Sequence, residues 1–136
     1  MIEYMQHCPE GTLIYHNHGK QIIKHSMPWI IEQWCLRHLF SYAGYLKAVK
    51  QNFGYSYGVP LYLCDEMMLI PVGRIRDYEM MWINQASIKC VYTENRRFYI
   101  HFISESILEV NMTQTHYEIM VKKLGKIRNT KVKHFH

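Results

Sequence analysis

Apolar and polar residues alternate in several stretches of this chain, which is typical of strands that bury one face. Two such stretches, Thr12 to His16 and Lys20 to His25, flank the sequence His16-Asn17-His18-Gly19. Asn and Gly tolerate the positive φ angles that tight hairpin turns require. The pattern therefore predicts a β-hairpin near the N-terminus.

The spacing of apolar positions then lengthens from two residues to three or four. Ser26 can cap a helix, and Pro28 suits its first turn. The positions that share one face of this helix are Ile31, Trp34, Cys35, His38, Leu39 and Tyr42. An amphipathic helix is predicted here. The pattern could continue through Leu46 and Val49, although Gly44 weakens it.

The second half of the chain predicts more strands and a final helix. After a Gly- and aromatic-rich loop at 51–59, the predicted strands are 61–64, 67–72, 80–84, 88–93, 97–103 and 107–110. Pro71 indicates that its strand ends there or lies at a sheet edge. Thr115 and Glu118 form a capping-box pattern. The apolar stripe of the final helix is Tyr117, Met120 or Val121, Leu124 and Ile127. Hairpins and helices in this order predict an α+β domain.

Charge is distributed unevenly over the 136 residues. Six of the 16 Lys and Arg residues follow Glu118 with no acid among them, which leaves ten bases against 11 acids elsewhere. We expect one domain over residues 1–128 and a basic tail over 129–136. A basic terminal segment suits an anionic partner such as nucleic acid. A solvated tail that aids solubility is the alternative.

The remaining composition points to an intracellular protein without a cofactor. No apolar run reaches the length of a membrane span, and the N-terminus lacks the features of a secretory signal, so we expect a cytoplasmic protein. The four cysteines form no Cys-x-x-Cys pair and are expected to be reduced and buried. They are Cys8, Cys35, Cys64 and Cys90.

Motifs for catalysis are absent from the sequence. It has no phosphate-binding loop and no nucleophile elbow, and its His and Cys spacings match no closed metal site. Asp65-Glu66 is more typical of a tight turn than of a carboxylate pair for acid–base catalysis. Nothing that flanks Cys35 would lower the pKa of its thiol. The expectation is a protein that is not an enzyme and holds neither metal nor cofactor.

Residues 28 to about 100 resemble the competence transcription factor family ComK. A Pro-led helix with Cys35 precedes Ser41-Tyr42-Ala43-Gly44, which is the most specific part of the resemblance. A Pro60-led strand, the step Ile70-Pro71, a loop with Arg74 and Arg76, and Trp82-Ile83 follow in the family's order. In the family Gly-Arg-Lys follows the helix, whereas Tyr45-Leu46 here precede Lys47. A basic contact is therefore expected at Lys47 or Lys50, or is lost.

The resemblance implies a function in transcription. The family binds double-stranded DNA at paired A/T-rich promoter boxes, largely through the minor groove, as dimers that assemble into tetramers, and it activates competence genes. An activator of this kind would also contact RNA polymerase. Longer members extend beyond both ends of this chain, and their C-terminal extension is tied to adaptor-guided proteolysis. The chain is similar to a shortened member.

Basic residues on loops and helices are the candidate DNA contacts. Arg74 and Arg76 are predicted to enter a narrow A/T-rich groove, and pairing with Asp77 and Glu79 at the surface is the alternative. Lys47 and Lys50 are predicted to contact phosphates. The further candidates are Arg96, Arg97, Lys122 and Lys126. The tryptophans Trp29, Trp34 and Trp82 are expected to pack in the core or a dimer interface rather than stack on bases.

Two other classes of protein stay open at this point. Phe53, Tyr55 and Tyr57 near Lys50 would suit an RNA- or single-strand-binding module, because bases stack on aromatic rings. The altered stretch after Gly44 would also suit a ComK-like protein-interaction module that has lost DNA binding.

Overall fold

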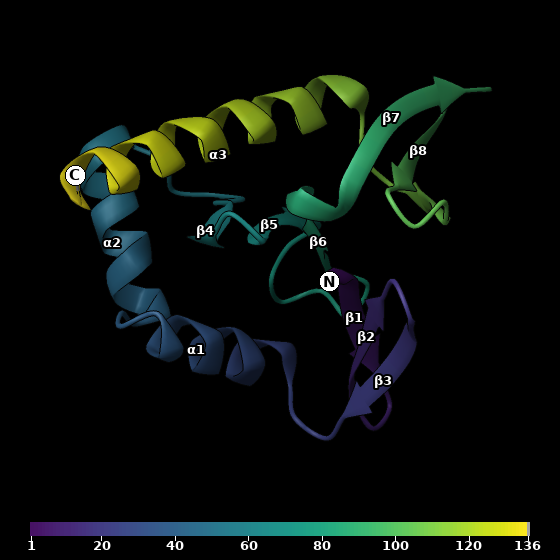
Figure 1. Ribbon diagram of the computed structural model, residues 1–136, viewed down its shortest axis with the longest axis horizontal. Coiled ribbons are helices and arrows are strands. Elements are labelled where there is room, and N and C mark those ends of the chain that lie inside the picture. The colour runs from purple at the N-terminus through teal and green to yellow at the C-terminus, as the bar shows by residue number, and fades with distance from the viewer. Residues whose placement is uncertain (136) are drawn as a thin grey trace.

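Within residues 1–135, which are those that the structure describes, nine strands form two antiparallel sheets beside three α-helices (Figure 1). The structure is a computed structural model. The first sheet contains β1 (Ile2–Cys8), β2 (Gly11–His16), β3 (Gly19–Ile23), β4 (Leu61–Cys64), β5 (Met67–Val72) and β6 (Met81–Asn84). The second contains β7 (Ile88–Glu94), β8 (Arg97–Phe102) and β9 (Ile107–Val110). The helices are α1 (Met27–Arg37), α2 (Tyr42–Phe53) and α3 (Gln114–Phe135).

One hydrophobic core joins both sheets and all three helices, which confirms the predicted α+β domain. Its buried members include Met5 of β1, Ile31 of α1, Leu69 of β5, Phe102 of β8 and Leu124 of α3. Figure 1 shows α3 running from the β7–β8 hairpin to α2. The predicted hairpins β2–β3, β4–β5 and β7–β8 all form.

Strand β1 was not predicted, yet it lies inside the first sheet. The strand order is β3-β2-β1-β6-β5-β4. The pairing with β2 shifts by one residue between Ile2 and Tyr4, so Glu3 occupies a β-bulge. Burial still alternates along the strand, and Glu3 and Met5 are both buried. A carboxylate at a buried position hides the strand from a search for alternating apolar residues.

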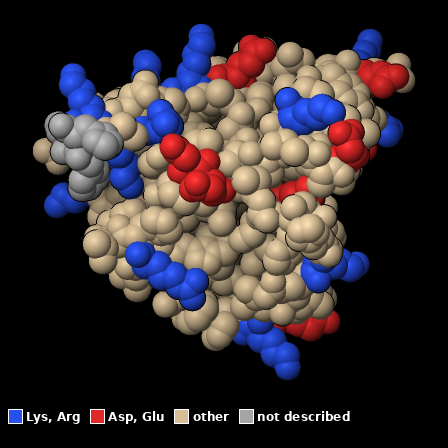
Figure 2. All heavy atoms as spheres, viewed as in Figure 1, with Lys and Arg blue, Asp and Glu red and all other residues tan. Residues whose placement is uncertain are grey.

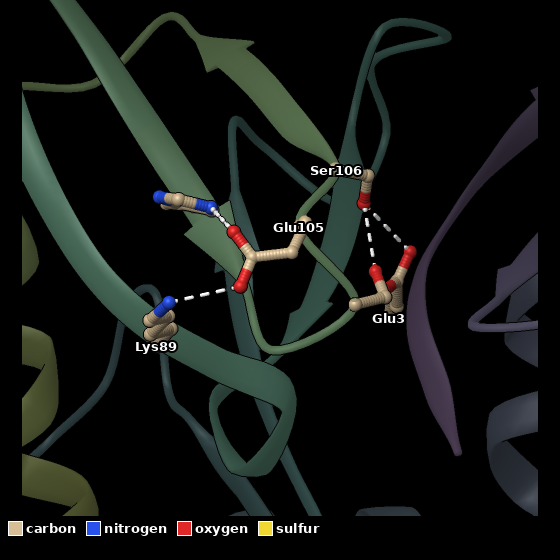
Figure 3. Close-up of polar contacts among 6 residues, drawn as sticks. Glu3, Lys89, Glu105 and Ser106 are labelled. Atoms are coloured by element: carbon tan, nitrogen blue, oxygen red, sulfur yellow. Dashed lines mark hydrogen bonds and ion pairs between the residues drawn. The ribbon is translucent and has the colours of Figure 1, made fainter.

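Glu3 joins the first sheet to the second. Its carboxylate accepts hydrogen bonds from the hydroxyls of Ser104 and Ser106 in the β8–β9 turn. On the other side of the same turn, Glu105 accepts from Lys89 Nζ at 2.9 Å and pairs with His101 Nε2 at 2.8 Å (Figure 3). The buried carboxylate therefore has hydroxyl partners, which a buried charge requires.

The predicted helix is in fact two helices. α1 ends at Arg37, where Leu39 takes the left-handed conformation with φ 69°, and Ser41 caps a new helix by accepting from Gly44 N at 3.0 Å. Gly44 lies in this first turn, where a Cβ would come within 2.9 Å of Ser41 Oγ. α2 then runs three residues into the segment predicted as a loop and ends at Gly54, φ 77°. The prediction of one helix is wrong because the Ser41 cap was not identified.

Of the two alternatives predicted for Pro71, the structure shows the first. β5 ends one residue after Pro71, at Val72, and it is not an edge strand because it pairs with both β4 and β6. The register explains how the ring is tolerated, because the pairing with β4 stops at Leu61 and Leu69, two residues before Pro71. The cap of α3 is Thr113, whose Oγ1 accepts from His116 N at 3.0 Å, and not Thr115.

Residues 129–135, expected as a basic tail, continue α3 as helix. The predicted stripe Tyr117, Met120, Leu124 and Ile127 is buried, and Val121 is half-buried at its border. Lys131 lies over the ring of Phe40, 4.1 Å from its centroid. Residue 136 lies outside the described residues.

Candidate nucleic-acid interface

The loop between β5 and β6 presents both candidate arginines to solvent. Gly73 begins it with φ 87°, a left-handed conformation that suits glycine. Arg74 Nε lies 3.5 Å from Asp77 Oδ2, with 71% of the arginine side chain exposed. Arg76 is exposed, and no ion pair involves it among the described residues. Surface pairing therefore accounts for Arg74 and leaves Arg76 available for a partner.

This loop lies beside the start of α2. Ile75, between the two arginines, lines a small cavity together with Pro28 of α1 and Tyr42 of α2. Tyr78, later in the loop, stacks on His7 of β1 with ring centroids 5.4 Å apart. The contacts with two helices and a strand hold the arginine loop near the first turn of α2.

α2 presents Lys47 and Lys50 on its exposed face. Tyr45 and Val49 are buried on the opposite face, and the Tyr45 hydroxyl donates to Pro60 O at 2.6 Å. Tyr45 and half-buried Leu46, which replace the family's basic pair, thus point toward the core. The first basic side chain on the exposed face of α2 is Lys47. At 1.5 Å per residue, Lys47 lies about 8 Å along the axis from Tyr42, beside which the arginine loop packs.

Helices α1 and α2 form a helix-turn-helix arrangement through the four residues 38–41. Figure 1 shows α2 turning away from the direction of α1. Leu39 in the turn is 94% exposed, which is unusual for a leucine.

The other candidate arginines lie at the far end of the molecule. Asn95 and Arg96 form the β7–β8 turn with φ angles of 52° and 65°, and Arg97 Nε lies 3.6 Å from Glu109 Oε1. Figure 1 places this hairpin at one end of α3 and α2 at the other. Since α3 has 22 residues, the two regions are separated by about 33 Å. The structure does not bring Arg96 and Arg97 together with Lys47.

α3 contributes a second set of lysines. Lys122 and Lys126 are exposed, whereas Lys123 lies 4.9 Å from the centroid of the Tyr55 ring. On the face drawn in Figure 2, Lys and Arg side chains gather where α2 meets the C-terminal end of α3 and are dispersed elsewhere. The candidate surface therefore comprises the arginine loop, the exposed face of α2 and the adjacent end of α3.

An ion pair fixes the end of α3 to the β4–β5 hairpin. Arg128 donates from Nε and Nη2 to the two carboxylate oxygens of Asp65, at 2.8 and 3.2 Å, and the Tyr62 hydroxyl donates to Oδ1 at 2.6 Å. These donors lower the pKa of Asp65 from 3.8 to about 2. Asp65 therefore has a structural role beyond the turn that its sequence predicts.

Acidification should weaken this attachment. Because the pKa of Asp65 is lower in the folded state than in the unfolded chain, its stabilising contribution is complete above about pH 4 and is lost as the pH falls toward 2. Asp65→Asn should therefore lower the melting temperature at pH 7 and flatten its decline between pH 4 and 2.5. Thermal unfolding at several pH values measures this. Equal acid dependence in wild type, Asp65→Asn and the control Glu94→Gln would contradict it.

Cys35 and His38 are held by packing and hydrogen bonding. Cys35 is fully buried, and burial raises the pKa of its thiol to about 11, which disfavours the thiolate that a nucleophile requires. His38 Nδ1 lies 2.9 Å from Trp34 O. In the described part of the chain, no group of three or more His, Cys, Asp and Glu is placed to hold a metal ion. The expectation of buried cysteines is wrong for Cys90, which is exposed.

Aromatic side chains are mostly engaged in packing. Trp82 is buried and Trp34 is half-buried, as predicted, but Trp29 is 45% exposed and stacks on His25 at 3.7 Å. Phe53 and Tyr55 stack on each other at 5.3 Å. Tyr57, 90% exposed, is the one member of the predicted aromatic group with its ring open to solvent. Because Phe53 and Tyr55 stack on each other, their rings are less available for stacking on bases, which argues against the single-strand-binding alternative.

These features describe a small α+β domain with exposed basic side chains on one loop and on two helices. A family model described as ComK protein matches residues 3–134. The chain therefore belongs to the ComK family, which is a family of competence transcription factors rather than enzymes. No curated protein and no solved structure matches it. No helix in residues 1–135 is both long enough and apolar enough to cross a membrane.

Proposed function

We propose that this protein is a sequence-specific DNA-binding activator that recognises paired A/T-rich promoter boxes, largely through the minor groove, and controls competence genes. It would act in the cytoplasm at the nucleoid, as a homodimer and as a dimer of dimers on DNA, and would contact RNA polymerase there. The observation that carries this proposal is the family match, which spans the arginine loop and all three helices.

The roles of the basic residues follow from their placement. Arg76 projects from a loop, and a loop tip can enter a narrow groove that excludes a helix; A/T-rich minor grooves attract arginine through their negative potential. Arg74, held by Asp77, would support it. Lys47 and Lys50 on α2, and Lys122 and Lys126 on α3, would contact phosphates and set the register. Arg96 and Arg97 would contact only DNA that extends beyond the part bound by the arginine loop, α2 and α3.

Arg76→Ala tests the groove-entering role. We expect the variant to bind an A/T-box duplex about tenfold more weakly, because one well-placed base-edge contact contributes about 1–3 kcal/mol. Its affinity for a G/C-rich duplex should change less, so the preference for A/T narrows. Fluorescence anisotropy with both duplexes measures the two affinities. Lys20→Ala, which removes an exposed charge from β3, is the matched control; an equal loss with both variants would remove Arg76 from the site.

The second candidate function is that of a protein-interaction module that does not bind DNA. Leu36 and Leu39, 50% and 94% exposed at the α1–α2 turn, are the observation that favours it. Exposed apolar side chains of this size often mark contact surfaces. If the folded protein binds neither the A/T-box duplex nor the G/C-rich duplex, the protein-interaction function replaces the DNA-binding proposal.

A further inference from the structure

An open groove separates α2 from the C-terminal half of α3, with the β4–β5 hairpin as its floor. It has a volume of about 910 Å³. Its walls are largely apolar and aromatic, and they include Phe40, Val49, Phe53, Leu63 and Ile127. Sites for small ligands have volumes of roughly 300–1,000 Å³ and mostly apolar walls with a few polar groups. The groove therefore has the size and lining of a ligand site.

One ammonium group lies within these apolar walls. Lys131 Nζ is 4.1 Å from the ring centroid of Phe40, 5.7 Å from that of Tyr45 and 5.6 Å from that of Tyr62, and it donates to Tyr62 O at 3.3 Å. It makes no ion pair with any side chain that the structure describes. Its removal from water lowers its pKa. A half-buried cation without a counter-charge is stabilised when an anion pairs with it.

The acidic residues at the groove do not cancel this charge. Asp65 is engaged by Arg128 and by the Tyr62 hydroxyl. Glu66 is exposed to water in the hairpin turn, where its charge is screened. The charge that faces the apolar walls is therefore that of Lys131, and the complementary ligand combines an anion with an apolar body.

We propose that this groove binds an amphipathic carboxylate, a monocarboxylic acid with an unbranched aliphatic chain. The carboxylate pairs with the Lys131 ammonium, and the chain lies along Leu39, Ala48 and Phe53, which line the groove and are not fully buried. The charge-assisted hydrogen bond supplies selectivity for the anion, and burial of the chain supplies affinity.

Occupancy of the groove would also affect α2. Gly44, Ala48 and Asn52 line the groove from α2, and Ala48 adjoins Lys47 in sequence. A ligand that packs on this flank lies next to the face that presents Lys47 and Lys50. The ligand site itself does not rest on the proposed DNA binding, because it can be measured without DNA.

Decanoate, used below its micelle concentration, is the test ligand, and decanol is its uncharged control. Isothermal titration calorimetry of the full chain should show decanoate binding at least about tenfold more tightly than decanol, because decanol carries no negative charge to pair with the Lys131 ammonium. Lys131→Met keeps the apolar stem and should abolish this difference. Lys133→Met, an exposed lysine on the same helix, should leave it intact. Ala48→Leu, which fills the groove from an exposed position, should weaken both ligands.

Several results of the binding titrations would overturn the proposal. These are no decanoate binding by folded wild type, equal affinity for decanoate and decanol, a difference that persists in Lys131→Met, tighter binding of decyltrimethylammonium, and binding that Ala48→Leu leaves unchanged. Tighter binding of the cation would show an aromatic cage for ammonium groups instead.

Sedimentation of each variant adds a control. If the wild type is a dimer, and Ala48→Leu dissociates it but decanoate does not, the groove is the contact surface for a second copy of the chain. Circular dichroism verifies that each variant is folded.

Discussion

Asn84→Asp should lower the free energy of unfolding by about 4 kcal/mol, the largest stability effect expected of a nearly isosteric change in this protein. Asn84 is fully buried at the end of β6. Its Nδ2 donates to Ile2 O at 2.8 Å and to Glu66 O at 3.0 Å, and its Oδ1 accepts from Met68 N at 3.0 Å and Ala86 N at 3.2 Å. One side chain thus holds β1, the β4–β5 turn, β5 and the turn before β7.

The aspartate removes both donors. The carbonyls of Ile2 and Glu66 would then face a carboxylate, and each orphaned buried group costs about 1–3 kcal/mol in addition to burial of the charge. Denaturant titration measures the change. Asn52→Asp is the control, because Asn52 is exposed on α2 and donates one bond, to Ala48 O at 2.8 Å. A fall at Asn84 no larger than at Asn52 would show that the network does not hold the sheet.

Reversing the charges of Lys47 and Lys50 should have the largest effect on DNA binding. Each phosphate contact contributes a slope of about −0.9 in the logarithm of affinity against the logarithm of salt concentration. Loss of two contacts should therefore make the slope less negative by about 2 and reduce affinity at 0.1 M salt on the order of 100-fold. Lys47→Glu/Lys50→Glu should bind A/T-rich and G/C-rich duplexes more weakly by similar factors, because phosphates carry no direct sequence information.

A second double variant separates a local contact from net charge. Lys20→Glu/Lys24→Glu changes the total charge by the same amount near β3, at the opposite edge of the sheet from β4, against which α2 packs. Anisotropy titrations at several salt concentrations should show a small change for this control. If both double variants lose affinity equally, α2 is not a contact surface and only the overall charge matters.

The sequence predicts most hairpins because their signals are local. Asn17-Gly19, Asp65-Glu66 and Asn95-Arg96 each place turn residues between stretches that alternate. β1 escapes prediction because the acidic residue Glu3 occupies a buried position where an apolar residue would be expected. The break between α1 and α2 is also local in principle: Ser41 caps α2, but a continuous apolar stripe through Leu46 and Val49 suggests one helix.

The candidate site is predicted less completely, for a different physical reason. Exposed basic residues can be identified from sequence, but their grouping depends on long-range packing. Ile75 lines a small cavity together with the first residue of α2, and the length of α3, about 33 Å, separates the Arg96 turn from α2. The cage around Lys131 joins this residue to Phe40, Tyr45 and Tyr62, which lie 69 to 91 positions earlier, and no local pattern encodes that contact.

The central claim, selective binding to A/T-rich duplex DNA, is tested most directly by anisotropy with two duplexes of equal length at two salt concentrations. One duplex carries paired A-tract and T-tract boxes, and the other is G/C-rich. We predict tighter binding to the A/T duplex and a preference that persists as salt rises, because groove contacts are less salt-sensitive than phosphate contacts. Equal binding that disappears steeply with salt would contradict the claim and leave only a generic basic surface.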